Sequence, residues 1–207
     1  MGRHSLFFDI DARSIREFHQ ECVATMGWAA NACARFQDGA WKYVELNHRC
    51  NSLLWEQEDQ ARRADVGPDC IAANKRAIDK YNQQRQDAIE RIDELLLTRL
   101  ADVPRIQTAR QNSETPGSMI DRLSILSLKI FHMGLQAART DVDANHIETC
   151  RAKYAVLQQQ LIDLGACLDD LLTQAMTGAV YFKVYRQFKM YNDPALNPYL
   201  YRLKSRA

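Results

Sequence analysis

Apolar residues recur every three or four positions through most of this chain, and this spacing restricts its fold more than any other feature. Between 11 and 36 the recurring residues are Ile15, Phe18, Cys22, Met26, Ala29 and Cys33. Between 154 and 171 they are Tyr154, Leu157, Leu161, Leu164, Leu168 and Leu171. Such spacing places the side chains on one face of an α-helix. The chain has only 8 Gly and 5 Pro in 207 residues, too few for the many tight turns of an all-β domain. The sequence therefore predicts an all-α protein.

Breaks between the periodic stretches predict five or six long helices. They cover 11–36, 40–65, 69–101, 118–139, a stretch that begins after Asp143, and a last aromatic helix over 179–192. Ser118 with Asp121 resembles a capping box, Asp143 can cap the fifth helix, and Gly178 permits a break after it. Residues 102–116 form the clearest linker, and no sustained strand is evident. Long helices with short links favour an antiparallel up-and-down bundle, and we expect a single domain over 1–207.

Charge and composition exclude several classes of protein. Lys and Arg number 27 and Asp and Glu 26, so no basic excess points to nucleic acid. No apolar run approaches the roughly 18 residues of a membrane span. The first residues lack the apolar core of a secretory signal. The six cysteines include no C-x-x-C pair, which favours buried, reduced thiols in a cytoplasmic protein.

Three consecutive predicted helices each carry a polar stripe. In the second helix the residues spaced three or four apart are His48, Asn51, Trp55, Glu58 and Arg62, with Asp59 beside them. In the third they are Lys75, Asp79 and Asn82, with Arg85 in the apolar row. The polar residues of the fourth helix are Asp121, Arg122, Lys129 and His132. Buried charge is costly unless it is paired, so these groups either satisfy one another or line a pocket.

The residue types suggest a role for each group if the stripes converge. Glu58, Asp59 and Asp79 would be metal ligands or a general base, and Mg²⁺ is the cation that such oxygen ligands suit. The groups that would neutralise phosphate are Arg62, Lys75, Arg85, Arg122 and Lys129. His48, Asn51 and Asn82 would orient a ligand, with Asp121 among them, and Trp55 would supply a stacking wall. The alternative is a network of salt bridges and amide hydrogen bonds that fixes helix register without any ligand.

Two further features leave alternatives open. Residues 181–207 hold six Lys or Arg against one Asp, which fits a grip on an anion, docking to an acidic partner, or a packing helix with solvated bases. Glu45-x-x-His48 is half of the motif of a di-iron bundle, but the chain has no matching second copy.

Three sequence blocks resemble a known family. They are Asn51-x-Leu53-Leu54-Trp55-x-x-Glu58-Asp59-x-Ala61-Arg62, Lys75-x-x-Ile78-Asp79-x-x-Asn82-x-x-Arg85, and Gly117-Ser118-x-Ile120-Asp121-Arg122-Leu123-Ser124-Ile125-Leu126-x-Leu128-Lys129. They resemble an uncharacterised bacterial "domain of unknown function" family of similar length. The resemblance implies an all-helical fold and a setting near glycosyltransferases and cell-envelope polysaccharides. It supplies no catalytic residues.

These observations give two hypotheses of function. The first is a small enzyme or binding protein that takes a phosphorylated or nucleotide-linked sugar between the second, third and fourth helices. The second is a non-enzymatic adaptor that docks on a glycosyltransferase or on itself, as a homodimer. The adaptor predicts a mutually satisfied polar network and an exposed aromatic patch around 181–201. Whether the protein is an enzyme stays open on the sequence.

Overall fold

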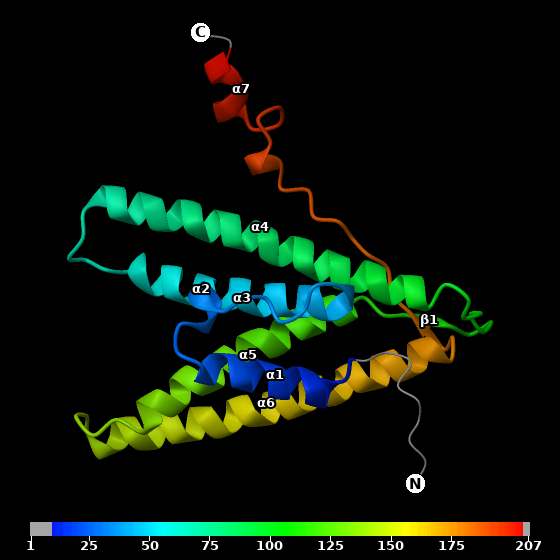
Figure 1. Cartoon of the computed structure of the whole chain (residues 1–207), viewed down its shortest axis with the longest axis horizontal. Helices are drawn as coiled ribbons and strands as arrows, with labels where there is room; N and C mark the ends of the chain where they lie inside the picture. Colours follow the sequence, from blue (N-terminus) through cyan, green and yellow to red (C-terminus); the bar gives the residue numbers. More distant parts are fainter. Residues whose placement is uncertain (1–9, 205–207) are drawn as a thin grey trace.

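The computed structural model describes residues 10–204, and nearly all of its regular structure is helical (Figure 1). Helices α1 (Ala12–Ala24) and α2 (Trp28–Asn31) precede two helical hairpins. In the first hairpin α3 (Gly39–Gln60) packs along α4 (Pro68–Arg99), and in the second α5 (Pro116–Ala137) packs along α6 (Ala144–Met176). The remaining elements are β1 (Arg110–Gln111), β2 (Val180–Tyr181), the 3₁₀ helix η1 (Met190–Asn192) and α7 (Pro198–Lys204). The predicted all-α bundle is confirmed.

The core lies where the apolar stripes of the long helices meet. Leu161, Leu164, Leu168 and Leu171 of α6 are all buried, as their spacing predicts. They join Ile15 and Phe18 of α1, Ile92 and Leu96 of α4, and Ile120 and Leu123 of α5 in one apolar cluster. Helix α1 packs on both α5 and α6, so the second hairpin is covered on one side (Figure 1).

The prediction of one helix over 11–36 is wrong. The helix ends at Ala24, and Gly27 has a φ of 67°, a left-handed conformation that interrupts the helix before α2 begins. Met26, which the periodic pattern placed on the buried face, is fully exposed. The apolar residues after Gly27 keep the helical spacing in the sequence, but they do not extend the apolar face of α1, because the helix has ended at Ala24.

The start of α5 also differs from the prediction. Its N-cap is Thr115, whose hydroxyl accepts a hydrogen bond from the Ser118 N–H at 3.2 Å, and Pro116 occupies the first turn. Ser118 is therefore inside the helix. The predicted cap of α6 is confirmed, since the Asp143 carboxylate accepts a hydrogen bond from the His146 N–H at 2.8 Å.

Residues 179–192 do not form the predicted aromatic helix. They begin with β2, which pairs in parallel with β1, and continue as extended chain to the short η1. Gly178 makes this geometry possible with a φ of 73°, and a Cβ there would lie 2.0 Å from the Pro104 carbonyl oxygen. The backbone of the linker and the chain after α6 can approach this closely only because residue 178 has no side chain.

Cys22, Cys50 and Cys150 are buried free thiols, as expected, but Cys33, Cys70 and Cys167 are exposed. None of the helices within residues 10–204 has the length and apolar character needed to cross a membrane.

Candidate functional site

A buried polar network joins α3 and α5. The amides of Asn47 and Asn51 donate to Asp121 Oδ1 at 2.8 and 2.9 Å. Asn51 also donates to Ser124 Oγ at 2.9 Å, and His48 Nδ1 is hydrogen-bonded to the same hydroxyl at 2.8 Å. All five side chains are buried. The structure thus brings together the predicted residues His48, Asn51 and Asp121. Their side chains are joined directly to Asn47 and Ser124 or to one another by hydrogen bonds.

Helix α4 reaches this network through a single guanidinium. Arg85 Nε lies 3.7 Å from Asp121 Oδ1, and the Arg85 side chain remains partly exposed. The Asp121 charge is therefore balanced by two amide donors from α3 and one cation from α4, which is what a buried carboxylate needs. The amide and hydroxyl hydrogen bonds of the network resemble the structural alternative, but two buried nitrogens, His48 Nε2 and Arg85 Nε, have no hydrogen-bond partner among the described residues.

The innermost member of this region is a histidine that the sequence analysis did not single out. The rings of His19 and His48 stack with centroids 4.2 Å apart. Burial lowers the pKa of both imidazoles, to about 3 for His48, so both are neutral at pH 7. Neither ring nitrogen of His19 has a hydrogen-bond partner among the described residues. His19 lies four residues after Ile15 and three before Cys22, a spacing that already placed it on the buried face of α1.

The other predicted residues lie away from this network. Glu58 forms an exposed ion pair with Arg62 at 2.7 Å, and Lys75 pairs with Asp79 on the surface of α4. Arg122 pairs with Glu114 at 2.6 Å. The three polar stripes therefore do not converge in one channel. Glu58 lies in the last turn of α3 and Arg62 follows its end, so both are beyond the network along the helix axis. Arg122 directly follows Asp121 and therefore points to a different side of α5.

A small polar groove lies along α4, beneath the C-terminal segment. Its volume is about 240 Å³, and its lining includes the predicted residues Asp79, Asn82 and Arg85. The opposite side of the groove comes from Gln187, Lys189 and Tyr191. This groove places three predicted residues together with one base of the C-terminal segment, Lys189, and only Arg85 also reaches the buried network.

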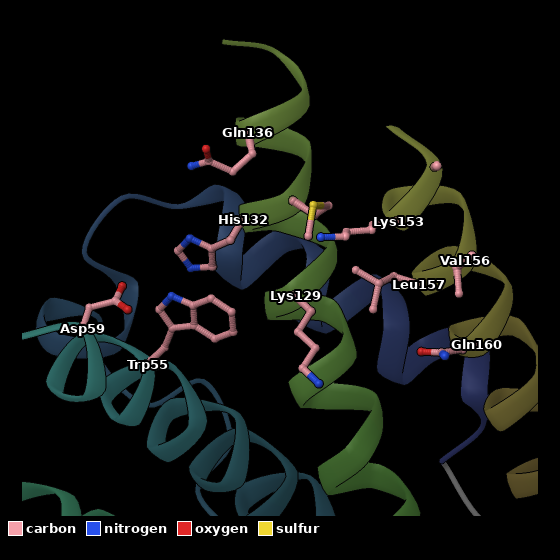
Figure 2. Close-up of a pocket in the computed structure, with 11 residues that line it drawn as sticks. Trp55, Asp59, Lys129, His132, Gln136, Lys153, Val156, Leu157 and Gln160 are labelled. Carbon is pink, nitrogen blue, oxygen red and sulfur yellow. The ribbon is translucent and has the colours of Figure 1, made fainter. Parts of the chain in front are cut away.

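A larger pocket opens between α3, α5 and α6, and its volume is about 720 Å³ (Figure 2). The predicted residues Trp55, Asp59 and Lys129 line it, as do His132 of α5 and Lys153 of α6. Trp55 and His132 stack with centroids 4.3 Å apart and planes 3° apart. Figure 2 shows this ring pair beside Asp59, with both lysines on the α5 and α6 side of it.

The electrostatics of the pocket follow from partial burial. Burial lowers the pKa of His132, and the nearby Asp59 carboxylate opposes that shift. The imidazole is therefore neutral at pH 7, whereas Lys129 and Lys153 are exposed cations. Lys153 was missed because α6 carries no polar stripe that singles it out. His132 belonged to the polar stripe of the fourth predicted helix, but only the packing of α5 on α3 pairs it with Trp55.

Within residues 10–204, no group of three or more His, Cys, Asp or Glu side chains is placed to hold a metal ion. The carboxylates of Glu58, Asp59 and Asp79 are thus not assembled as a common ligand set. The Glu45-x-x-His48 half-motif has other partners, since Glu45 binds backbone N–H groups and Arg49.

The fold and these sites define an all-α bundle protein with a buried polar network and an open, partly aromatic pocket. The chain belongs to the family described as "Protein of unknown function (DUF4254)", whose model matches residues 41–184. This range includes all the residues that line the larger pocket and the five hydrogen-bonded residues of the polar network. His19 lies outside it. Comparisons with curated proteins and with solved structures give no match.

Proposed function

We propose that this protein binds a phosphorylated or nucleotide-linked sugar in the pocket between α3, α5 and α6. The observation that carries the proposal is the Trp55–His132 ring stack, which lines the pocket together with Lys129 and Lys153. The pocket differs from the position expected on the sequence, because its third side is α6 rather than α4. Its volume of about 720 Å³ lies within the range of small-molecule sites.

The residue types match the two halves of such a ligand. The flat aromatic rings of Trp55 and His132 suit the face of a sugar or a nucleobase. Two exposed ammonium groups suit a phosphate or diphosphate, and Mg²⁺ would enter with the phosphates rather than bind a carboxylate cluster. Asp59 and Gln136 offer hydrogen-bonding groups for hydroxyls at the pocket edge. In the context that the family resemblance implies, the ligand would belong to cell-envelope glycan metabolism.

The test is a thermal-shift experiment on the full chain. The probes are a nucleoside diphosphate, its hexose conjugate and a hexose phosphate, each with and without Mg²⁺. At a ligand concentration of 100 times Kd, binding adds about 2.7 kcal/mol to the free energy of unfolding, and Tm rises accordingly. We expect the shift to disappear in Lys129→Gln/Lys153→Gln, since both side chains are exposed and their loss leaves the core intact.

The matched control is Arg62→Gln/Lys75→Gln. This variant removes two exposed cations that were also predicted to contact phosphate but that lie outside the pocket. It should keep the wild-type shift. The absence of a shift with every probe, or an equal loss of the shift in both double variants, would contradict the proposal.

The adaptor hypothesis concerns a different part of the molecule. The mutually hydrogen-bonded network and the exposed aromatic residues after Tyr185 are two features that it predicts.

A further inference from the structure

Residues 183–204, here called the C-terminal arm, hold most of the large exposed apolar side chains in the described part of the chain. Phe188 is 86% exposed and Tyr199 is 84% exposed. The other strongly exposed members are Tyr185, Met190, Tyr191, Leu196, Leu200 and Tyr201. Apolar side chains concentrated in this way on a surface indicate a binding site rather than chance exposure.

Only the first part of the arm is attached to the bundle. The Tyr185 hydroxyl accepts a hydrogen bond from Gln111 Nε2 at 2.9 Å, and Gln187 N–H donates to Glu90 Oε1 at 3.1 Å. Arg186 pairs with Glu90 and Glu94 of α4. These contacts fix where the arm leaves the molecule.

The outer part of the arm is held by its own hydrogen bonds. Asn197 Nδ2 donates to the Tyr191 carbonyl oxygen at 2.7 Å, and Asn197 Oδ1 accepts from the Tyr199 N–H at 2.9 Å. Helix α7 contacts no other helix or strand among the described elements, and Figure 1 shows it standing away from the bundle. A seven-residue helix without tertiary packing is only marginally stable in water, so its exposed side needs a partner.

The chemistry of the arm indicates what that partner is. Tyr199, Leu200 and Tyr201 are exposed side chains of α7. The bases along the arm and just beyond it are Lys183, Arg186, Lys189, Arg202, Lys204 and Arg206, and Asp193 is the single acid. The arm is thus cationic, although the whole chain carries a net charge of only +1. A binding partner that complements the arm would therefore have a surface that is both anionic and apolar.

A lipid bilayer fits this arm better than a protein groove does. The exposed apolar side chains are spread along an extended segment and a short helix rather than along one long helix face. Tyrosine dominates them, and its amphipathic ring suits the headgroup level of a bilayer. We infer that the C-terminal arm binds the surface of a membrane that contains anionic lipids, with Phe188 and Tyr199 inserted at the interface and the bases other than Arg186, which pairs with α4, facing the headgroups.

Co-sedimentation of the full chain with vesicles tests this inference. One set of vesicles is phosphatidylcholine alone, and the other contains phosphatidylglycerol as well. We expect binding to the anionic vesicles, weakening as salt is raised, and little binding to the neutral ones. Phe188→Ser/Tyr199→Ser should bind the anionic vesicles at least about tenfold less, since two apolar rings are lost from the interface.

The matched control is Ile162→Ser, which removes an exposed apolar side chain from α6 and should bind like the wild type. Thermal unfolding of Phe188→Ser/Tyr199→Ser should match the wild type, because both rings are solvent-exposed. The inference is overturned if the wild type does not bind anionic vesicles, or if the double variant binds them equally well. Either result would indicate that the arm binds a protein rather than a membrane. Because the pocket residues are unchanged in these variants, the sugar-binding proposal is tested separately.

Discussion

At the scale of single residues, a close contact between α4 and α5 depends on Gly117. Asp93 of α4 is buried and accepts a hydrogen bond from the Gly117 N–H at 2.6 Å, which satisfies a free donor in the first turn of α5. A Cβ on residue 117 would lie 2.5 Å from the Ile89 carbonyl oxygen and 2.9 Å from Asp93 Oδ1. The glycine in the Gly117-Ser118 block is thus explained by packing.

We expect Gly117→Ala to lower the free energy of unfolding by about 1–3 kcal/mol, because α4 and α5 must move apart and the Asp93 hydrogen bond lengthens. Urea denaturation measures the change. Gly134→Ala in the same helix is the control, since its new Cβ would lie 3.4 Å from Tyr154, an ordinary contact. That variant should be neutral or more stable, by up to about 1 kcal/mol. Equal destabilisation by both substitutions would contradict this account.

At the scale of elements, two side chains of α3 hold the segment that connects α1 to α3. Glu45 Oε2 accepts hydrogen bonds from the N–H groups of Arg35 and Phe36 at 2.9 and 3.0 Å. Arg49 donates to the carbonyl oxygens of Trp28 and Ala29 at 3.1 and 2.8 Å, and its guanidinium lies 4.5 Å from the Trp28 ring centroid. Glu45 and Arg49 also pair with each other at 3.0 Å. The segment has little regular secondary structure of its own, so hydrogen bonds from the Glu45 and Arg49 side chains hold its backbone in place.

Glu45→Gln should therefore weaken the attachment of this segment to α3. We expect a loss of about 2–3 kcal/mol in the free energy of unfolding, because the buried pair with Arg49 is broken. Amide hydrogen exchange at residues 35 and 36 should become much faster than in the wild type.

Glu58→Gln provides the comparison, with the same chemical change at an exposed i,i+4 pair of the same helix. It should alter stability by less than about 0.5 kcal/mol. If Glu58→Gln were as destabilising as Glu45→Gln, burial would not be the deciding factor.

At the scale of the whole molecule, the stacked His19–His48 pair makes stability depend on pH. Burial lowers both native pKa values below the ordinary value of about 6.5, so the unfolded chain binds more protons as the pH falls. The stability contributed by the neutral pair is complete above about pH 6.5 and is lost as the pH falls below it. Asp93 acts in the opposite direction, because burial raises its pKa to about 6 and acidification between about pH 6 and 4 favours its native state.

We expect the free energy of unfolding to fall by about 1.4 kcal/mol for each histidine and each pH unit below about 6, with Asp93 offsetting up to a similar amount. Urea denaturation between about pH 7 and 5 measures the slope. His19→Phe should make the slope shallower, since one proton-binding site is lost from the unfolded chain. Asp93→Asn should make it steeper, since the opposing group is gone. A slope unchanged in both variants would show that other groups control the acid response.

Much of the architecture was predictable from local patterns in the sequence. The starts of α4 and α6 follow from the Gly67-Pro68 break and from the Asp143 cap, which act within a few residues. Helix α3, by contrast, ends at Gln60 rather than at the predicted residue 65. The break at Gly27 and the cap at Thr115 were missed although both are local. At Gly27 the apolar spacing that continues to Cys33 predicted a longer helix. At Thr115 the Ser118–Asp121 pair predicted a later start for α5.

The sequence by itself determined that long helices form, which faces are apolar, and that polar residues such as Asn51 and Asp121 lie on faces that meet another helix. These follow from helical periodicity and the cost of burying unpaired charge. Only the tertiary structure decided that His19 stacks on His48, that Trp55 and His132 join Lys153 in a pocket, and that α7 stands away from the bundle. Spacing fixes the angle of a side chain around its own helix, whereas the crossing and offset of neighbouring helices decide which side chains meet.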